Sequence, residues 1–437
     1  MSIPVVTVGR EQAELVGGLE RLHGPVTVVR RCAELAELIA ACQSGLARVA
    51  IVAGDTSDIT ITLVDRLAVV GVGIVGLSDD DGERRRLGGL GVSSASEGVP
   101  SDELAELVAH AARLADAQAA TSSFSLAGAR AVGDAPPTPD ETPEGGDGEP
   151  SPVGDIVAFW GPIGSPGRTT LAVNAAAELV RTGKNVLVVD ADTYGASVAA
   201  QLGLLDEAAG LAQACRLADQ GALDAPALRR LATPVVTEAG ILLVLTGITR
   251  ADRWPELRAP ALGAVLERAR EIADVVVVDA GFCLEADEEL SFDTMAPRRN
   301  AATLRSLELA DRVIAVGAAD AVGMPRLVRA LAELEQAVPH ANPEVVFNKV
   351  RKGALGRFPE RALRDAWARF GPRRPISALV PHDADAADAA LFGGSLLLEC
   401  APQSQLRTAV ANLVCSDEQQ NRKTAVASAR ALVARPR

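Results

Sequence analysis

Aromatic residues are scarce in this 437-residue chain, which has 8 Phe, 3 Trp and 1 Tyr. So few rings predict a core of aliphatic side chains, and they argue against a surface that stacks the bases of single-stranded nucleic acid. Long apolar runs are lacking as well, because the stretch from Leu67 to Leu77 is shorter than the about 20 residues that span a bilayer. The first residues have no basic segment followed by an apolar one, so we expect no secretory signal peptide.

Paired cysteines are also lacking. The six cysteines lie far apart, and none belongs to a Cys-x-x-Cys motif. This spacing is typical of small buried side chains in a reducing compartment rather than of a disulfide framework or a metal cluster. We therefore expect a cytoplasmic protein.

Basic residues are outnumbered, 43 against 57 acidic ones, which gives a net charge of −14. The imbalance is uneven along the chain. Residues 131–155 hold seven acidic residues and no basic one, whereas residues 349–374 hold nine basic residues against two acidic ones. The overall charge argues against a general nucleic-acid binder, but the basic segment leaves that question open.

The first 118 residues alternate short apolar runs with helical patterns that end in residues 102–117. The runs are Val5–Val8, Val26–Val29, Val49–Val52 and Gly73–Leu77. This alternation predicts an α/β domain with a parallel sheet covered by helices. The pattern resembles a receiver domain of the flavodoxin-like type. No lysine occurs in residues 1–118, and Gly9-Arg10-Glu11 follows the first strand, so we expect a degenerate receiver that serves docking rather than phosphorelay.

Three further segments follow. Residues 119–154 are rich in Pro, Gly and acidic residues, which predicts a disordered linker. Residues 155–405 return to strand and helix alternation and form a second parallel-sheet domain. Residues 406–437 are interpreted as a C-terminal helix and a basic tail. The fold class is thus α/β, with two parallel-sheet domains.

Polar residues follow the predicted strands of the second domain. The strands are Ile156–Trp160, Val186–Val189, Ile241–Leu245, Val275–Val278, Val313–Val316 and Val345–Phe347. Asp190 and Asp192 follow the second of these, Asp279 follows the fourth and Asn348 the last. Open parallel sheets bind ligands at the carboxyl ends of their strands.

A glycine-bearing loop joins the strand Ile156–Trp160 to a helix that starts at Thr169. A loop of this kind can wrap its N–H groups around a polyphosphate, and the helix N-terminus adds its dipole. The residues expected to bind the nucleotide here are Gly164, Ser165, Gly167, Arg168, Thr169 and Thr170. The alternative is a glycine-rich turn between strand and helix without a ligand.

With this loop the chain resembles the MinD/ParA family of deviant Walker A P-loop ATPases, whose loop reads Lys-Gly-Gly-x-Gly-Lys-Thr-Thr. The matching residues run from Ile163 to Thr170 and continue through Ala172-Val173-Asn174, Gly183, and Val186 to Asp192. Asp279, Asn348 and Val380-Pro381-His382-Asp383 extend the resemblance. The receiver-like domain in front makes the CpaE/TadZ branch the most similar one.

The resemblance implies ATP and Mg²⁺ as ligands and gives roles to individual residues. Thr169 would hold Mg²⁺ and Asp279 would bind it through water. Asp192 would orient the attacking water, with Arg168 at the phosphates. Asn348 would lie near the adenine, and Pro381 would cover the base.

Two positions depart from the family pattern. Ile163 stands where the family has a lysine that reaches across a dimer, and Arg168 replaces the main loop lysine. Lys and Arg are not interchangeable at such a site, and lost positive charge slows phosphoryl transfer. We therefore expect nucleotide binding with weak or absent hydrolysis, which leaves the enzyme question open.

The resemblance implies a nucleotide-dependent homodimer that recruits an unidentified protein partner to a septum site, a pole or a pilus or secretion assembly. Two alternatives stay open: a pseudo-ATPase scaffold without turnover, and a DNA-associated partition ATPase that binds nonspecific DNA through residues 349–374. The tail has too few bulky apolar residues for a membrane helix, so we expect no membrane association.

Overall fold

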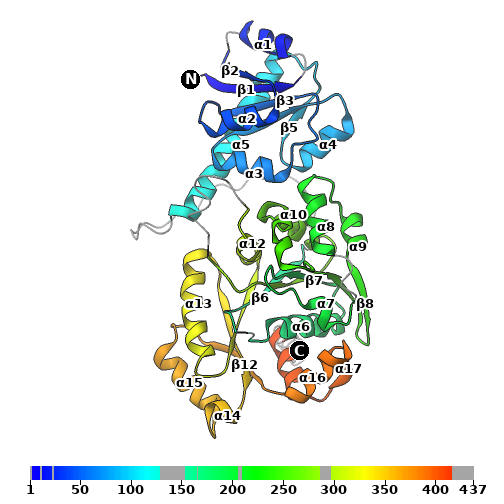
Figure 1. The fold of residues 1–437 in the computed structure, drawn as a ribbon, viewed down its shortest axis with the longest axis vertical. Coiled ribbons are helices and arrows are strands. Elements are labelled where there is room, and N and C mark those ends of the chain that lie inside the picture. The colour runs from blue at the N-terminus through cyan, green and yellow to red at the C-terminus, as the bar shows by residue number, and fades with distance from the viewer. Residues whose placement is uncertain are drawn as a thin grey trace, which may run out of the picture. The chain divides into compact units, whose positions relative to one another are not determined.

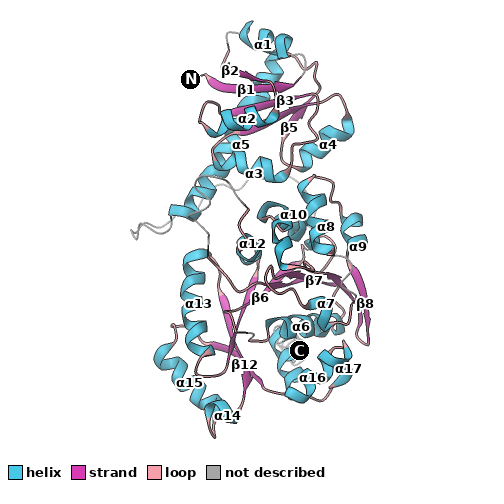
Figure 2. Cartoon of the chain, viewed as in Figure 1, coloured by secondary structure: helices cyan, strands magenta, loops and turns pink. Residues whose placement is uncertain are grey.

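The computed structural model describes residues 2–9, 12–21, 24–127, 153–164, 166–204, 209–285 and 297–415. The chain divides into two compact units, each built on its own sheet (Figures 1 and 2). The predicted α/β class with two sheet domains is confirmed. None of the helices in these ranges is long and apolar enough to cross a bilayer.

The N-terminal sheet has five parallel strands in the order β2-β1-β3-β4-β5. This is the order of the flavodoxin-like doubly wound fold. Its elements are β1 (Ile3–Gly9), α1 (Gln12–Arg21), β2 (Val26–Cys32), α2 (Leu35–Gln43), β3 (Val49–Ala53), α3 (Ile61–Val69), β4 (Gly73–Leu77), α4 (Asp81–Gly89), β5 (Ser93–Ala95) and α5 (Ser101–Ala127). Helix α5 continues into the segment that the sequence predicts as a linker. Residues 128–152 lie outside the described part of the chain.

The second sheet has eight strands in the order β13-β12-β11-β6-β10-β7-β9-β8. Its strands are β6 (Asp155–Trp160), β7 (Val186–Ala191), β8 (Thr233–Thr237), β9 (Gly240–Leu245), β10 (Val275–Ala280), β11 (Arg312–Ala318), β12 (Pro343–Val350) and β13 (Ile376–Pro381). The sheet is mixed rather than wholly parallel, because β8 pairs antiparallel with β9 at one edge. A two-residue turn joins these two strands, which only an antiparallel pair permits.

Helices cover this sheet on both faces. They are α6 (Arg168–Arg181), α7 (Val198–Gln201), α8 (Gly210–Asp219), α9 (Ala225–Leu231), the 3₁₀ helix η1 (Ala251–Glu256), α10 (Ala259–Arg270), α12 (Ala301–Leu309), α13 (Gly323–Ala337), α14 (Lys352–Leu355), α15 (Pro359–Phe370), α16 (Ala384–Gly393) and α17 (Leu397–Cys400). Figure 1 shows α10 and α12 on one side of β7 and α6 on the other. A last helix covers residues 405–415, and the predicted basic tail beyond it lies outside the described residues.

Helix α6 lies at the centre of the core beneath β6, β7 and β10. Its residues 171–180 are all buried, most of them Ala, Leu and Val, as the scarcity of aromatic residues predicts. Asn174 is buried among them, and its amide joins two segments: Nδ2 donates to the Thr170 carbonyl at 2.8 Å, and Oδ1 accepts from the Leu397 N–H at 2.7 Å. Both polar ends of this side chain are therefore satisfied in the core.

A buried carboxylate joins α6 to the last helix. The Glu178 side chain is 1% exposed and accepts from Arg181 Nε at 2.6 Å and from Arg407 Nε at 2.7 Å. Burying an acidic side chain is costly unless it is paired, so the two arginines together stabilise Glu178 in the core.

Replacing Arg407 with Ala should lower the free energy of unfolding by about 2 kcal/mol, because Glu178 keeps Arg181 but loses its less exposed partner. Urea unfolding measures the change. The control is Arg361→Ala, which removes a highly exposed pair with Asp365 and should cost less than about 0.5 kcal/mol. Equal losses in the two variants would contradict this assignment.

Candidate functional site

The loop after β6 starts the site, and its glycines are required by close approach. A Cβ on Gly161 would lie 2.1 Å from the Val316 carbonyl oxygen. Gly167 has a φ of +93°, which L side chains rarely adopt, and a Cβ there would lie 2.4 Å from Asn348 Nδ2. The loop is therefore held close to the ends of β11 and β12.

Helix α6 begins directly after Gly167, so its first N–H groups face the same side as the loop. Asn348 fixes the loop from β12: its Nδ2 donates to the Pro166 carbonyl at 2.8 Å, and its Oδ1 accepts from the Lys349 N–H at 2.8 Å. The Asn348 side chain is 5% exposed overall. Both ends of this amide are thus engaged by the protein.

Strand register brings the carboxylates together. Asp279 on β10 pairs with Asp190 on β7, and it also pairs with Phe159 on β6, just before the loop. Asp192 follows two residues after Asp190 and is 6% exposed. Three acidic side chains therefore meet at the carboxyl edge of the sheet, where open parallel sheets bind ligands.

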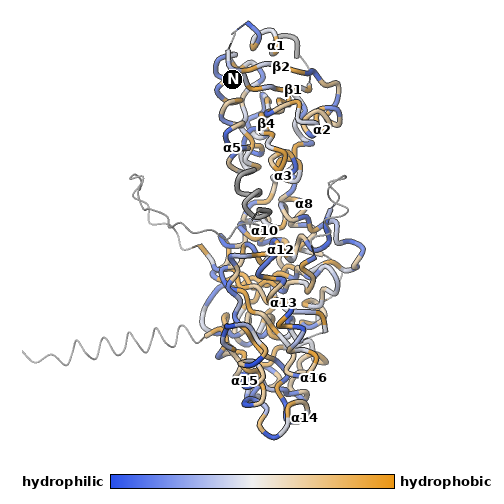
Figure 3. Tube along the Cα trace, turned by 90° about the vertical axis from the view of Figure 1, so that its left-hand side faces the viewer, coloured by the Kyte–Doolittle hydropathy of each residue, from blue (hydrophilic) through white to orange (hydrophobic). Residues whose placement is uncertain are grey.

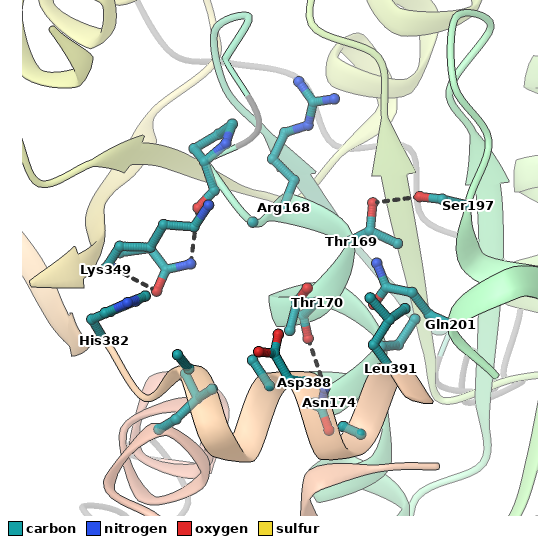
Figure 4. Close-up of a pocket in the computed structure, with 18 of the residues that line it drawn as sticks. Arg168, Thr169, Thr170, Asn174, Ser197, Gln201, Lys349, His382, Asp388 and Leu391 are labelled. Carbon is teal, nitrogen blue, oxygen red and sulfur yellow. Dashed lines mark hydrogen bonds between the residues drawn. The ribbon is translucent and has the colours of Figure 1, made fainter. Parts of the chain in front are cut away.

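Thr169 contacts one of these acids. Its Oγ1 donates to Asp279 Oδ2 at 2.6 Å. Ser197 Oγ lies 3.3 Å from the same hydroxyl, as Figure 4 shows. The second carboxylate oxygen, Asp279 Oδ1, is buried and has no hydrogen-bond partner among the described residues. A buried acceptor without a partner is costly, so this oxygen is a natural contact for a bound cation or its water.

Asp192 is held by Arg168 and by the backbone. Arg168 Nη2 donates to Asp192 Oδ2 at 3.1 Å, and Nη1 donates to the Gly161 carbonyl at 2.7 Å. Asp192 Oδ1 accepts from the N–H groups of Tyr194 and Gly195 at 2.8 and 3.2 Å. Arg168 therefore has specific partners within the protein before any ligand is bound.

Burial dominates the titration of this cluster. Removal from water raises the pKa of Asp279 to about 6, although the charge of Arg168 and the Thr169 hydroxyl act to lower it. Burial, and then the negative charge of Asp279, also hold the pKa of Asp190 well above its usual range. Asp190 accepts from the N–H groups of Asp192 and Val198, which offsets part of this effect.

The loop and Asp192 line a cavity of about 630 Å³. Loop residues Gly164 and Gly167 line it together with Thr169 and Thr170, and the opposite wall comes from β12, β13 and α16. Figure 4 shows Arg168, Thr169 and Thr170 on one side, and Lys349, His382 and Asp388 around the rest. The volume lies in the range of pockets that bury a small-molecule ligand.

Most residues that the sequence predicts for the site lie together here. Those that line the cavity are Gly164, Gly167, Arg168, Thr169, Thr170, Asp192, Asn348 and Pro381. Asp279 does not line the cavity but accepts a hydrogen bond from Thr169, which does. Ser165 lies outside the described residues. Ile163 is 58% exposed at the mouth of the cavity.

Sequence reasoning missed several neighbours of the site. The sequence points to Lys349 only as part of the basic segment 349–374, although it directly follows Asn348. Tyr194 follows Asp192 and packs against Phe282 at 4.7 Å between ring centroids, and both line the cavity. Arg326 on α13 donates to the Ile163 carbonyl at 3.4 Å. Lys349 directly follows Asn348, and Tyr194 lies two residues after Asp192, so the motifs could have pointed to both. No local signal points to Arg326.

The family of CobQ/CobB/MinD/ParA nucleotide binding domains (CbiA) matches residues 157–396. The chain belongs to this family. The match begins within β6 and covers the glycine loop and the strands β7 and β10, which lead to the acids of the site. A search of curated proteins finds no match.

Solved structures give similar folds at low identity. The cell division ATPase MinD of Pyrococcus furiosus is 17% identical, with a TM-score of 0.47 over 61% of this chain and 100% of that one. A ParA family ATPase of Chlorobium tepidum TLS is 19% identical, with a TM-score of 0.49 over 60% of this chain and 98% of that one. Cobyrinic acid a,c-diamide synthase of Mycobacterium smegmatis, with bound ADP and magnesium, is 17% identical. Its TM-score is 0.42 over 60% of this chain and 92% of that one.

A metal would need ligands from outside the protein. In the described ranges no group of three or more His, Cys, Asp or Glu side chains is arranged to hold a metal ion. Mg²⁺ is usually bound by one or two protein oxygens, several waters and the phosphates of a substrate. Thr169 Oγ1 and the buried Asp279 Oδ1 fit such a site.

The raised pKa of Asp279 makes a prediction for stability. The folded state binds this proton more tightly than the unfolded chain, so its contribution to stability is lost as the pH rises from about 4 to about 6. Asp279→Asn removes this titration. The free energy of unfolding of the variant should fall less than that of the wild type over this pH range. At pH 7 it should be higher than that of the wild type by about 1–3 kcal/mol. Urea unfolding at several pH values measures it.

Asp385→Asn, at an exposed position of α16, is the control and should follow the wild-type profile. An Asp279→Asn profile that is parallel to that of the wild type would contradict the buried, protonatable carboxyl.

Proposed function

We propose that the second unit binds ATP with Mg²⁺ and that nucleotide binding switches the protein between states. The observation that carries this proposal is the contact between Thr169 Oγ1 and Asp279 Oδ2, with the second carboxylate oxygen buried and unsatisfied beside it. Membership of a nucleotide-binding family supports it. The glycine loop and the N-terminus of α6 supply the N–H donors that polyphosphates require.

Each part of the ligand has a place in the cavity. The phosphates lie against Gly164, Gly167 and the first turn of α6, where Thr170 is also exposed to the cavity. Thr169 would hold Mg²⁺ directly and Asp279 would hold it through water, and the metal would neutralise charge on the phosphates. The base would lie near Asn348 and Pro381, which line the opposite wall.

Slow hydrolysis follows from the same contacts. Asp192 is the residue to orient an attacking water, yet Arg168 and two backbone N–H groups already hold its oxygens. Ile163 contributes no charge at the cavity mouth. Phosphoryl transfer depends on positioned positive charge, so these features should reduce the rate of hydrolysis more than the affinity for nucleotide. A scaffold that binds nucleotide without turnover is the limiting case.

The switch would act through assembly. A nucleotide-dependent homodimer would recruit a protein partner at a pole, a septum site or a pilus or secretion assembly, as in the CpaE/TadZ-like branch. The N-terminal unit, which has the flavodoxin-like strand order and lacks lysine over residues 1–118, would supply docking rather than phosphotransfer. In this proposal the second unit is the nucleotide-dependent switch, and the N-terminal unit is the domain that docks to a partner.

Titration with a fluorescent ATP analogue tests the binding. The wild type should bind it, and Mg²⁺ should tighten binding by about tenfold or more, since the metal joins the phosphates to Thr169 and Asp279. Thr169→Ala should lose most of this Mg²⁺ effect, whereas Thr408→Ala on the last helix should keep it. No binding at millimolar nucleotide, with or without Mg²⁺, would contradict the proposal.

Nonspecific DNA binding is a second candidate, favoured by the exposed charges around α14 and α15. Six basic side chains of the segment 349–374 are exposed there: Lys352, Arg357, Arg361, Arg364, Arg369 and Arg373. Hydrophilic and apolar residues alternate along this part of the chain (Figure 3). The ion pair between Arg361 and Asp365 on α15 is 3.6 Å long and largely exposed, so it neutralises little of this charge.

Charge reversal tests this candidate. If α15 binds DNA phosphates, Arg361→Glu with Arg364→Glu should lower the affinity for a mixed-sequence duplex by about tenfold or more, and it should flatten the dependence of log K on log salt. Fluorescence anisotropy over a salt series measures both. The matched control reverses Arg268, which is paired with Glu271 on α10. Equal affinity in all three proteins would exclude DNA binding by α15.

A further inference from the structure

The basic residue of the loop itself is already engaged. Arg168 donates to Asp192 and to the Gly161 carbonyl, and its side chain is 12% exposed. These contacts use two of the five N–H donors of Arg168, and the Asp192 carboxylate offsets the positive charge that Arg168 would bring to a phosphate. The cavity therefore needs another cation if a polyphosphate is to bind without a large electrostatic cost.

A second cation reaches the loop from the end of β12. Lys349 has a φ of 62°, the only positive value among the described non-glycine residues. Such a conformation is uncommon for a residue with a side chain and persists where its surroundings enforce it. Here the Lys349 N–H donates to Asn348 Oδ1, while Asn348 Nδ2 holds the Pro166 carbonyl. Asn348 thus fixes the Lys349 backbone beside the loop.

The Lys349 side chain runs over the loop. Its Cε lies 3.9 Å from the position that a Cβ on Gly167 would take. Lys349 lines the same cavity as Gly164, Gly167 and Thr169, and Figure 4 shows it across the pocket from Thr169. Of the described residues that line this cavity, Arg168 and Lys349 are the two that carry a positive charge.

We propose that the Lys349 ammonium binds the phosphate groups of the nucleotide and so takes the place of the charge that Arg168 spends on Asp192. The inference rests on the proposed nucleotide binding and names the residue that supplies its charge. Lysine suits the position because its compact ammonium acts as a point charge with three donors. The left-handed backbone at Lys349 aims this charge over the glycine loop instead of along the strand.

Lys349→Met is the decisive variant, because methionine keeps the unbranched apolar stem and removes the charge. Equilibrium binding is measured for ATP and for adenosine, each with Mg²⁺. Lys349→Met should weaken ATP binding by about 10- to 100-fold, the range for a lost charge-assisted contact, and leave adenosine binding unchanged. Lys349→Arg, which keeps the charge, should stay within about threefold of the wild type for ATP. Lys352→Met, on exposed α14, is the matched control and should equal the wild type.

The outcomes separate this inference from the proposal beneath it. A wild type that binds no ATP overturns both. A wild type that binds ATP while Lys349→Met binds it equally well overturns the role of Lys349 alone. Equal weakening of ATP and adenosine also overturns it, because the stem would then pack against the base or support the local structure.

A measurement on the wild type covers the case in which Lys349→Met does not fold. Amine acetylation with mass spectrometry reports the reactivity of Lys349 with and without ligand. ATP should protect Lys349 while adenosine at saturation does not, and Lys352 should react equally in both samples. Equal protection by the two ligands, or none by ATP, would overturn the inference.

Discussion

Three carboxylates buried at one edge of the second sheet determine how the site is built. Strand register places Asp190 beside Asp279, and Asp192 follows two residues later. Buried negative charges repel one another and lose hydration, so each must be protonated, hydrogen-bonded or paired. Asp190 takes two backbone N–H groups, and Asp192 takes two more and Arg168. Asp279 keeps Thr169 and an oxygen without a partner.

The contacts of Arg168 bear on the proposed difference between nucleotide binding and turnover. The pairing of Arg168 with Asp192 offsets one negative charge of the acid cluster. It also offsets the positive charge that the loop would otherwise present to phosphates. Asp192 is also connected to the segments that follow β7 and β10. Tyr194 packs on Phe282 and hydrogen-bonds Asn300 at 2.8 Å, and Arg299 stacks over the Tyr194 ring at 3.8 Å. A ligand that changes the contacts of Asp192 therefore acts on a connected group of side chains, as a switch requires.

Local sequence signals predicted the strands that carry apolar runs and the residues that end them. Strand β5, Ser93–Ala95, was missed because it has no apolar run, and the edge strands β8 and β13 were missed because their residues are largely exposed or partly exposed. The antiparallel pairing of β8 with β9 could not be predicted from apolar runs either, since it depends on the turn between the two strands.

Most of the site could be predicted because its residues follow strands or belong to one loop, whose spacing is visible in the sequence. The partners of those residues could not. The pairing of Arg168 with Asp192, the engagement of Asn348 by Pro166 and the position of Lys349 over Gly167 join segments far apart in the chain. A left-handed φ at lysine has no sequence signature, so the second cation at the cavity became apparent only in three dimensions.

The central claim is that Thr169 and Asp279 form the protein side of a metal site completed by nucleotide phosphates. Anomalous diffraction from a crystal grown with Mn²⁺ and a non-hydrolysable ATP analogue tests it most directly. The account predicts one manganese peak about 2.1 Å from Thr169 Oγ1, beside Asp279 and in contact with the phosphates, because Mn²⁺ prefers the same oxygen ligands as Mg²⁺. Nucleotide density in the cavity with no metal at Thr169, or with the metal on residues elsewhere, would contradict it.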